Sequence, residues 1–185
     1  MKRLIAGCLL ALTAVLILSG CGKKEAGSDL LGKGTGTIAG VTWTVPARWQ
    51  VMPERPMRVA TYGTPAESGD AEGGECAVSF FGSGMGGDPE MNIARWVGQF
   101  ENPGEPVKAA VSPNGIKVTT VRVKGTYLAP AGPMMESTGS KPGFELLGAI
   151  IEAPEGAVFF KLTGPEKTVA AAEAEFNAMV SSLKK

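Results

Sequence analysis

Residues 144–163, FELLGAIIEAPEGAVFFKLT, decide the fold of this chain. They divide into two apolar runs, Phe144 to Ala153 and Gly156 to Thr163, on either side of a Pro-Glu-Gly turn signal. The two runs predict the strands of a β-hairpin, because branched and aromatic side chains favour an extended backbone. Their hydrophobic residues are too continuous for a sheet with one face in water, so we expect both faces to be covered.

Four further strands are expected before this hairpin: Thr37 to Val45, Met57 to Tyr62, Cys76 to Phe81 and Lys117 to Tyr127. One helix is expected to begin at Asp88-Pro89-Glu90, with Asp88 as its N-cap. Its apolar stripe comprises Ile93, Trp96, Val97 and Phe100. A second, alanine-rich helix is expected after Gly164-Pro165. The order β-β-β-α-β-β-β-α predicts an α+β domain, an antiparallel sheet of about six strands flanked by two main helices.

This order resembles the PsbP/DcrB-like fold of secreted and lipid-anchored domains. Three pieces carry the resemblance: Val45-Pro46-Ala-Arg-Trp49, Asn92-Ile-Ala-Arg-Trp96 and Phe176-x-x-Met179-Val180-x-Ser-Leu183. The resemblance implies a non-catalytic domain that docks on membrane assemblies or assists them. Partners differ within this fold, so no binding residue is carried over from it.

The first twenty residues have the composition of a secretory signal, with Lys2 and Arg3 ahead of an apolar run from Leu4 to Leu18. The ending Leu18-Ser19-Gly20-Cys21 resembles the bacterial lipobox. The resemblance implies cleavage after Gly20 and acylation of Cys21 by membrane lipid. The alternatives are an ordinary cleaved signal and an uncleaved helix.

This reading predicts a signal peptide over residues 1–20, a lipidated cysteine and flexible tether over 21–36, and a single α+β domain over 37–185. The glycine-rich tether has a root-mean-square reach of about 20 Å. We expect an exported protein anchored to a bacterial membrane. Gly22 stands where some Gram-negative lipoproteins carry an inner-membrane retention aspartate, so in such a cell the outer membrane, facing the periplasm, is expected.

Composition excludes several classes of function. Eighteen Lys and Arg residues balance eighteen Asp and Glu residues, so no basic field attracts nucleic acid. The chain has no histidine, which removes the commonest general base and the commonest zinc ligand. We therefore expect no enzyme, no metal and no cofactor. The alternative of acid–base chemistry by a carboxylate pair, such as Glu145 with Glu152, stays open.

Two loops are the candidate partner contacts. The first is Gly82-Ser-Gly84-Met-Gly-Gly87, which fits G-x-G-x-x-G, although Asp88 places a negative charge where a phosphate would bind. The second contains Met134 and Met135, an adaptable apolar pair. We expect an envelope protein as the partner. The alternative is a carrier of a small apolar or lipidic ligand in a cleft between sheet and helix.

Three other features have a structural and a functional reading. Cys76 is the only thiol left after lipidation, so it is either a buried residue on a strand or the site of an intermolecular disulfide. The acidic loop from Glu67 to Glu75 is either solvated or a site for a hard cation. The three tryptophans, Trp43, Trp49 and Trp96, either pack in the core or line a binding surface.

Overall fold

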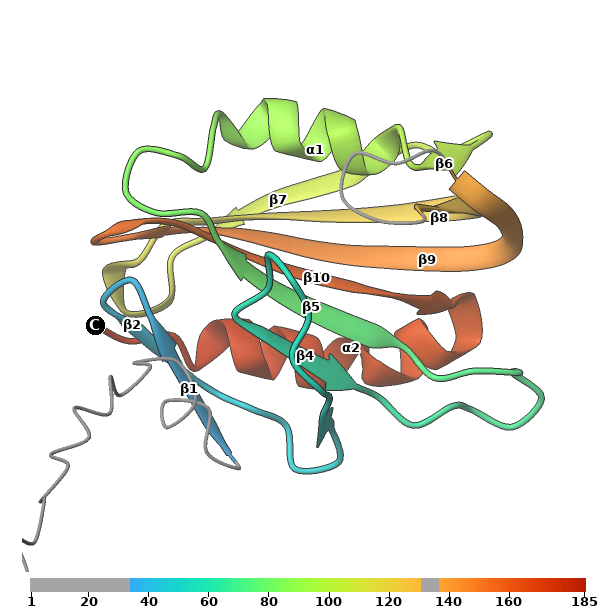
Figure 1. Ribbon diagram of the computed structural model, residues 1–185, viewed down its shortest axis with the longest axis horizontal. Helices are drawn as coiled ribbons and strands as arrows, with labels where there is room; N and C mark the ends of the chain where they lie inside the picture. The colour runs from blue at the N-terminus through green and yellow to red at the C-terminus, as the bar shows by residue number, and fades with distance from the viewer. Residues whose placement is uncertain (1–33, 131–136) are drawn as a thin grey trace, which may run out of the picture.

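The computed structural model describes residues 34–130 and 137–185. They are arranged in three layers (Figure 1). Helix α1 (Pro89–Val97) covers one face of an antiparallel sheet, and helix α2 (Glu166–Ser181) covers the other. A separate hairpin of β1 (Thr35–Ile38) and β2 (Val41–Thr44) packs beside α2.

The main sheet contains eight strands, in the order β3-β4-β5-β10-β9-β8-β6, with β7 paired to β8. The strands are β3 (Gln50–Val51), β4 (Ala60–Gly63), β5 (Glu75–Phe80), β6 (Phe100–Glu101), β7 (Val107–Val111), β8 (Val118–Pro130), β9 (Ser137–Ala153) and β10 (Gly156–Pro165). A short 3-10 turn, η1 (Pro113–Gly115), joins β7 to β8. The predicted hairpin is the β9–β10 pair at the centre, and the α+β class is confirmed.

Both faces of the central hairpin are buried, as its continuous apolar sequence predicts. On the α2 side, Leu147, Ala149, Ile151 and Phe160 join the larger core with the helix and the β1–β2 hairpin. On the α1 side, the alternate residues, among them Leu146, Ile150 and Phe159, pack against the helix. Side chains of a strand alternate between faces, so two consecutive apolar residues supply both cores.

Several boundaries differ from the sequence prediction. The two-residue strands β3 and β6 are too short to produce an alternating pattern, and every residue of β7 is exposed. Helix α1 ends at Val97 with Gly98 as its C-cap, so Phe100 lies on β6 rather than on the helix. Met57 has a positive φ of 63°, which breaks the expected strand, and β4 begins only at Ala60.

The start of α1 follows the local signal in the sequence. The Asp88 carboxylate accepts a hydrogen bond from the Met91 N–H at 3.1 Å, and Pro89 occupies the first helical turn. Within residues 34–130 and 137–185, no helix is long and apolar enough to cross a bilayer.

Candidate functional site

The structure describes one of the two loops predicted to contact a partner. Cys21, Met134 and Met135 lie outside the described residues. The loop from Gly82 to Gly87 connects β5 to α1 and is described throughout.

Glycine is required in this loop because Gly82, Gly84 and Gly87 have positive φ angles of 97°, 73° and 70°. The buried Asn92 side chain donates to the carbonyl oxygen of Gly86 at 2.8 Å and therefore ties the loop to the helix. Because Asp88 caps this helix, a carboxylate already occupies the position that a phosphate would need. The loop therefore does not have the arrangement of a nucleotide-binding turn.

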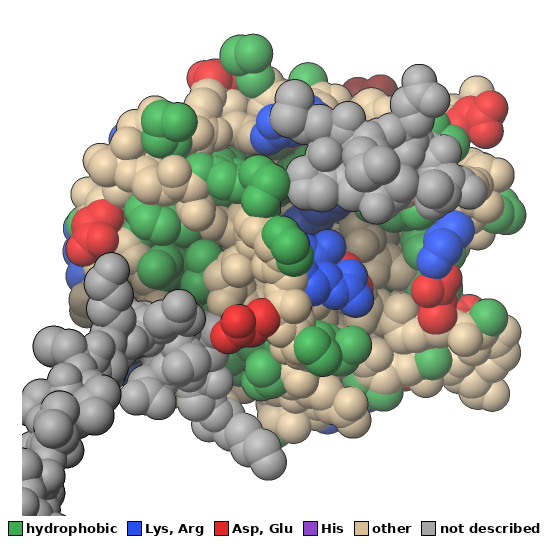
Figure 2. Space-filling model, viewed as in Figure 1, with side chains coloured by type: hydrophobic (Ala, Val, Ile, Leu, Met, Phe, Trp, Pro, Cys, Tyr) green, Lys and Arg blue, Asp and Glu red, His purple; other side chains and the backbone are tan. Residues whose placement is uncertain are grey.

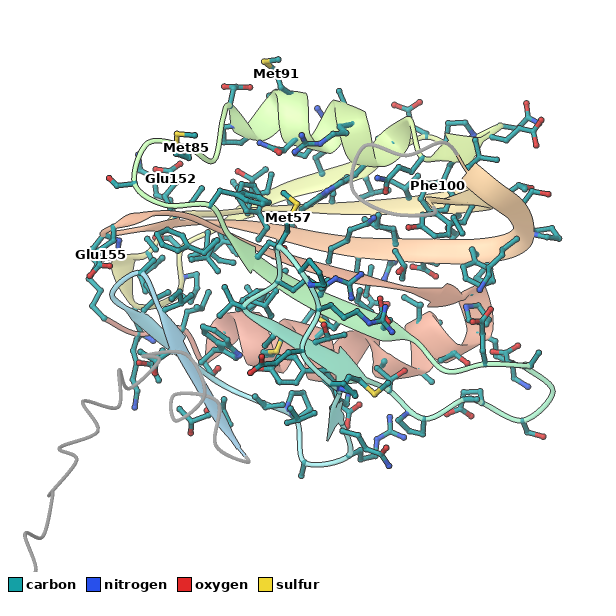
Figure 3. The ribbon with its side chains drawn as sticks, in the orientation of Figure 1. Met57, Met85, Met91, Phe100, Glu152 and Glu155 are labelled. Carbon is teal, nitrogen blue, oxygen red and sulfur yellow. The ribbon has the colours of Figure 1, made fainter. Side chains whose placement is uncertain are left out.

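Four large apolar side chains are exposed on or next to this loop, on helix α1 and on the connection between β3 and β4. Met57 is 59% exposed, Phe81 41%, Met85 71% and Met91 73%. We call these four residues the apolar rim. Figure 3 shows Met85 on the loop, Met91 on the outer side of α1 and Met57 in front of the sheet. Exposed methionines adapt to different partner shapes, and such clusters are typical of contact surfaces.

A cluster of cations lies on the same side of the sheet. Arg58 Nη1 lies 2.7 Å from Glu75 Oε1, and Arg55 Nη1 lies 2.9 Å from Glu75 Oε2. Lys161 and Arg95 lie close enough to contribute to the same local potential. We call Arg55, Arg58, Arg95 and Lys161 the cationic cluster. Figure 2 shows Lys and Arg side chains gathered near the middle of this view.

Lys161 is the half-buried member of the cationic cluster. Its Nζ donates to Gln99 Oε1 at 2.5 Å and to Tyr127 Oη at 3.3 Å, and it lies 5.3 Å from the centroid of the Tyr127 ring. Burial, together with the positive charge of Arg58 and Arg95, lowers the pKa of Lys161 to about 8, while Glu75 opposes the change. Lys161 is therefore the described lysine whose charge is least favoured at neutral pH.

The apolar rim and the cationic cluster are connected through β10. Phe81 packs on Phe159 with ring centroids 5.7 Å apart. Phe159 and Lys161 are two residues apart on one strand, so they point to the same face of the sheet. Phe81 of the apolar rim therefore packs on the same face of the sheet as Lys161 of the cationic cluster.

Three carboxylates of the acidic loop, those of Asp70, Glu72 and Glu75, have structural partners. Asp70 Oδ2 accepts the Thr168 N–H at 3.0 Å and the Thr168 hydroxyl at 2.5 Å, which caps the first turn of α2. Glu72 pairs with Lys141 at 2.5 Å. No group of three or more metal-ligating side chains occurs in residues 34–130 and 137–185. Asp70 thus serves a helix end, and Glu72 and Glu75 serve ion pairs.

The carboxylate pair named as an enzymatic alternative is not brought together. Glu145 is 1% exposed on β9, where Arg122 Nε lies 2.9 Å and Lys124 Nζ 3.6 Å from its oxygens. Burial raises the pKa of Glu145, against the effect of Lys124 and Arg122. Glu152 lies seven residues further along the strand and is exposed beside Lys117.

A groove of about 590 Å³ lies on the opposite side of the sheet, between β7 and α2. Its lining includes Val107 and Val111 of β7, Phe176 and Val180 of α2, and Arg122 of β8. The centre of the sheet–helix interface is filled by core side chains, so this groove lies at the margin of the core.

Cys76 and the three tryptophans are buried core residues. Cys76 is fully buried on β5, and burial raises the pKa of its thiol. Trp43, Trp49 and Trp96 are all at most 6% exposed. The tryptophans therefore pack in the two cores and are not an exposed sugar-binding platform.

Among known proteins, the similarity of this chain is one of fold. No family model matches the chain, and no curated protein matches it. The solution structure of cyanobacterial PsbP (CyanoP) from Synechocystis sp. PCC 6803 aligns with 13% identity and a TM-score of 0.50, over 90% of this chain and 98% of that chain. The chain has a PsbP-like fold. The structure of PA94 from Pseudomonas aeruginosa, a protein of unknown function, aligns with 12% identity and a TM-score of 0.47, over 82% of this chain and 95% of its own.

Within this PsbP-like fold, the cationic cluster is the feature that sequence reasoning missed. Arg58 and Arg95 are 37 positions apart in the chain and belong to different elements. One signal was present, since Lys161 interrupts the apolar run Phe159-Phe160-Lys161-Leu162. A lysine inside a run with both faces covered indicates a polar site on one of those faces.

Proposed function

We propose that this protein is an envelope lipoprotein, anchored through acylated Cys21, whose domain binds a protein partner without catalysing a reaction. The observation that carries the proposal is the apolar rim, with Met85 and Met91 both more than two-thirds exposed. A tether between the anchor and the domain would let this surface reach a partner near the membrane.

The apolar rim suits a protein partner because its methionines are adaptable and because ordered residues hold parts of it in place. Methionine side chains are unbranched and polarisable, so they pack on partners of different shape. Phe81 is held by contact with the buried Phe159 ring, and the loop bearing Met85 is tied to α1 through Asn92. The contact surface is thus mounted on ordered elements, which reduces the entropy lost on binding.

A non-catalytic role is supported by the side chains available. The chain lacks histidine, and the carboxylates of Asp70, Glu72 and Glu75 are engaged in capping or ion pairs. The buried Glu145 is paired with Arg122 and Lys124. These carboxylates therefore stabilise the described domain through a helix cap and ion pairs.

The groove between β7 and α2 favours a second candidate, binding of a small apolar or lipidic ligand. Its volume of about 590 Å³ is within the range of ligand sites. The Arg122–Glu173 ion pair in its lining would require a ligand with a polar group.

The two candidates are distinguished by cross-linking in cells followed by capture of the tagged full-length protein. The rim variant Met85→Gln/Met91→Gln keeps side-chain length but removes apolar character, and Val111→Thr is the matched change in the groove. We expect one envelope protein to be captured by the wild type and by Val111→Thr, and lost with the rim variant and with Cys21→Ala.

Capture that is unaffected by the rim variant would contradict the assignment of this surface. Absence of any partner above background, together with a lipid that co-purifies with the wild type and is lost with Val111→Thr, would favour the ligand carrier.

A further inference from the structure

The cationic cluster carries more positive charge than its described surroundings neutralise. Its four cations share one carboxylate, Glu75, which already contacts Arg55 at 2.9 Å and Arg58 at 2.7 Å. Arg95 donates to the Asn92 side chain, which is neutral, and forms no ion pair within residues 34–130 and 137–185. The cluster therefore has the charge deficit of an anion-binding surface.

Lys161 is held in position by hydrogen bonds to neutral groups. Its ammonium group contacts the Gln99 amide oxygen and the Tyr127 hydroxyl, both of which are neutral. Its position over the Tyr127 ring, 5.3 Å from the centroid, adds a weak attraction but no counter-charge. A half-buried ammonium fixed in this way is pre-organised for an anionic ligand.

Several donors of the cluster are not used by the described residues. Arg58 uses only Nη1, for Thr61 and Glu75, and Arg95 uses only Nη2, for Asn92. Within the described residues, the remaining guanidinium N–H groups of Arg58 and Arg95 and one ammonium N–H of Lys161 have no hydrogen-bond acceptor. Guanidinium groups favour carboxylate and phosphate oxygens, which match their planar set of donors.

We propose that Lys161, Arg58 and Arg95 form a binding site for an oxyanion, which is either a carboxylate or a phosphate group. Glu75 and Arg55 act as the positioning pair, because they hold the Arg58 guanidinium beside the site. Burial and, after it, the positive charge of Arg58 and Arg95 lower the pKa of Lys161, and a bound anion would offset the charge effect, which supports the inference. This site is independent of whether the apolar rim binds a protein.

The test uses this coupling between anion binding and the ammonium group. The full-length chain, purified in a non-ionic detergent, is treated with an amine-acetylating reagent in sodium chloride, sodium acetate or sodium phosphate at equal ionic strength. Acetylation of each lysine is measured by mass spectrometry of its peptide. Lys117, whose side chain is 78% exposed, is the internal control.

We expect acetate or phosphate to slow acetylation of Lys161 at least about threefold and saturably, because a bound anion raises the pKa of the amine and shields it. Lys117 should react equally in all three salts. Protection by phosphate alone assigns a phosphate group, protection by acetate alone assigns a carboxylate, and protection by both assigns the shared chemistry.

A second variant tests the geometry. Arg95 is exposed, so Arg95→Gln should fold normally and raise the anion concentration for half-protection of Lys161 about tenfold. Lys108→Gln, a change in an exposed lysine of β7, should leave it unchanged. Equal protection of Lys161 and Lys117, no protection of Lys161, or no effect of Arg95→Gln would overturn the proposal.

Discussion

The indole ring of Trp96 lies directly against the backbone of Gly148. A Cβ atom placed on Gly148 would lie 2.4 Å from Cζ3 of this ring. The contact joins α1 to the central strand β9, and the Trp96 ring also packs edge-to-face on Phe159, with ring centroids 6.3 Å apart. Glycine at this position therefore sets the depth at which the helix packs on the sheet.

Replacement of this glycine should loosen the α1 layer. We expect Gly148→Ala to lower the free energy of unfolding by about 1–3 kcal/mol, because the added methyl group must displace the Trp96 ring. Urea unfolding measures the change. Gly139→Ala on the same strand is the control, since a Cβ there meets no atom of residues 34–130 or 137–185 within 4 Å. Equal effects of the two variants would contradict this packing role.

The cap of α2 by Asp70 should contribute measurably to stability. The helix has Pro165 at its N-cap position, with no side-chain cap bond of its own, and Asp70 accepts the Thr168 N–H instead. We expect Asp70→Ala to lower the free energy of unfolding by about 1 kcal/mol. Glu72→Ala, which removes an exposed ion pair, should change it by less than about 0.5 kcal/mol.

Acid should weaken the contact between Arg48 and Glu175. The Arg48 guanidinium lies 2.8 and 2.9 Å from the two Glu175 oxygens, and this hydrogen bonding lowers the pKa of the Glu175 carboxyl, with a smaller effect from Trp49. A carboxyl whose folded pKa is depressed stabilises the fold above its unfolded pKa. That stabilisation is lost as the pH falls through the folded pKa.

The corresponding variant is Glu175→Gln, which should lower the free energy of unfolding by about 1 kcal/mol at neutral pH. The difference from wild type should shrink as the pH falls below about 4, in unfolding curves recorded across pH. Glu155→Gln, on the exposed β9–β10 turn at the edge of the molecule in Figure 3, is the matched control, and it should change the free energy of unfolding at neutral pH by less than about 0.5 kcal/mol. A constant difference for Glu175→Gln would refute the linkage.

Removal of the Lys161 charge should stabilise the fold. The pKa of Lys161, about 8, lies below its unfolded value, so the penalty is full at neutral pH and disappears as the pH rises toward about 10. We expect Lys161→Met to raise the free energy of unfolding at neutral pH by about 1 kcal/mol or more. This gain should decrease at alkaline pH. Lys117→Met should give no gain, and a destabilised Lys161→Met protein would contradict the prediction.

The Cys76 thiol should be inert in the folded protein. It is fully buried, and burial raises its pKa, so little reactive thiolate forms. We expect iodoacetamide to alkylate the Cys76 peptide only after unfolding in guanidinium chloride, as measured by mass spectrometry. Rapid alkylation of the native protein would instead support the intermolecular-disulfide reading.

Some parts of this structure were predictable because their causes are local. The cap at Asp88, the proline after it and the apolar stripe of α1 lie within one short segment, and the helix begins where they indicate. The burial of both faces of β9 and β10 follows from their continuous apolar runs. The strands β3, β6 and β7 carried no such pattern, because their pairing with a neighbour, not their own periodicity, makes them strands.

By itself, the sequence determined the α+β class, the central hairpin and the start of α1, because each depends on patterns of residues close together in the chain. Only the tertiary structure decided the partners of the charged groups. Asp70 caps a helix 98 positions away, and Lys161 meets Gln99 across 62 positions. Such contacts depend on how the layers pack, and no local pattern of charge or hydrophobicity specifies which distant elements will meet.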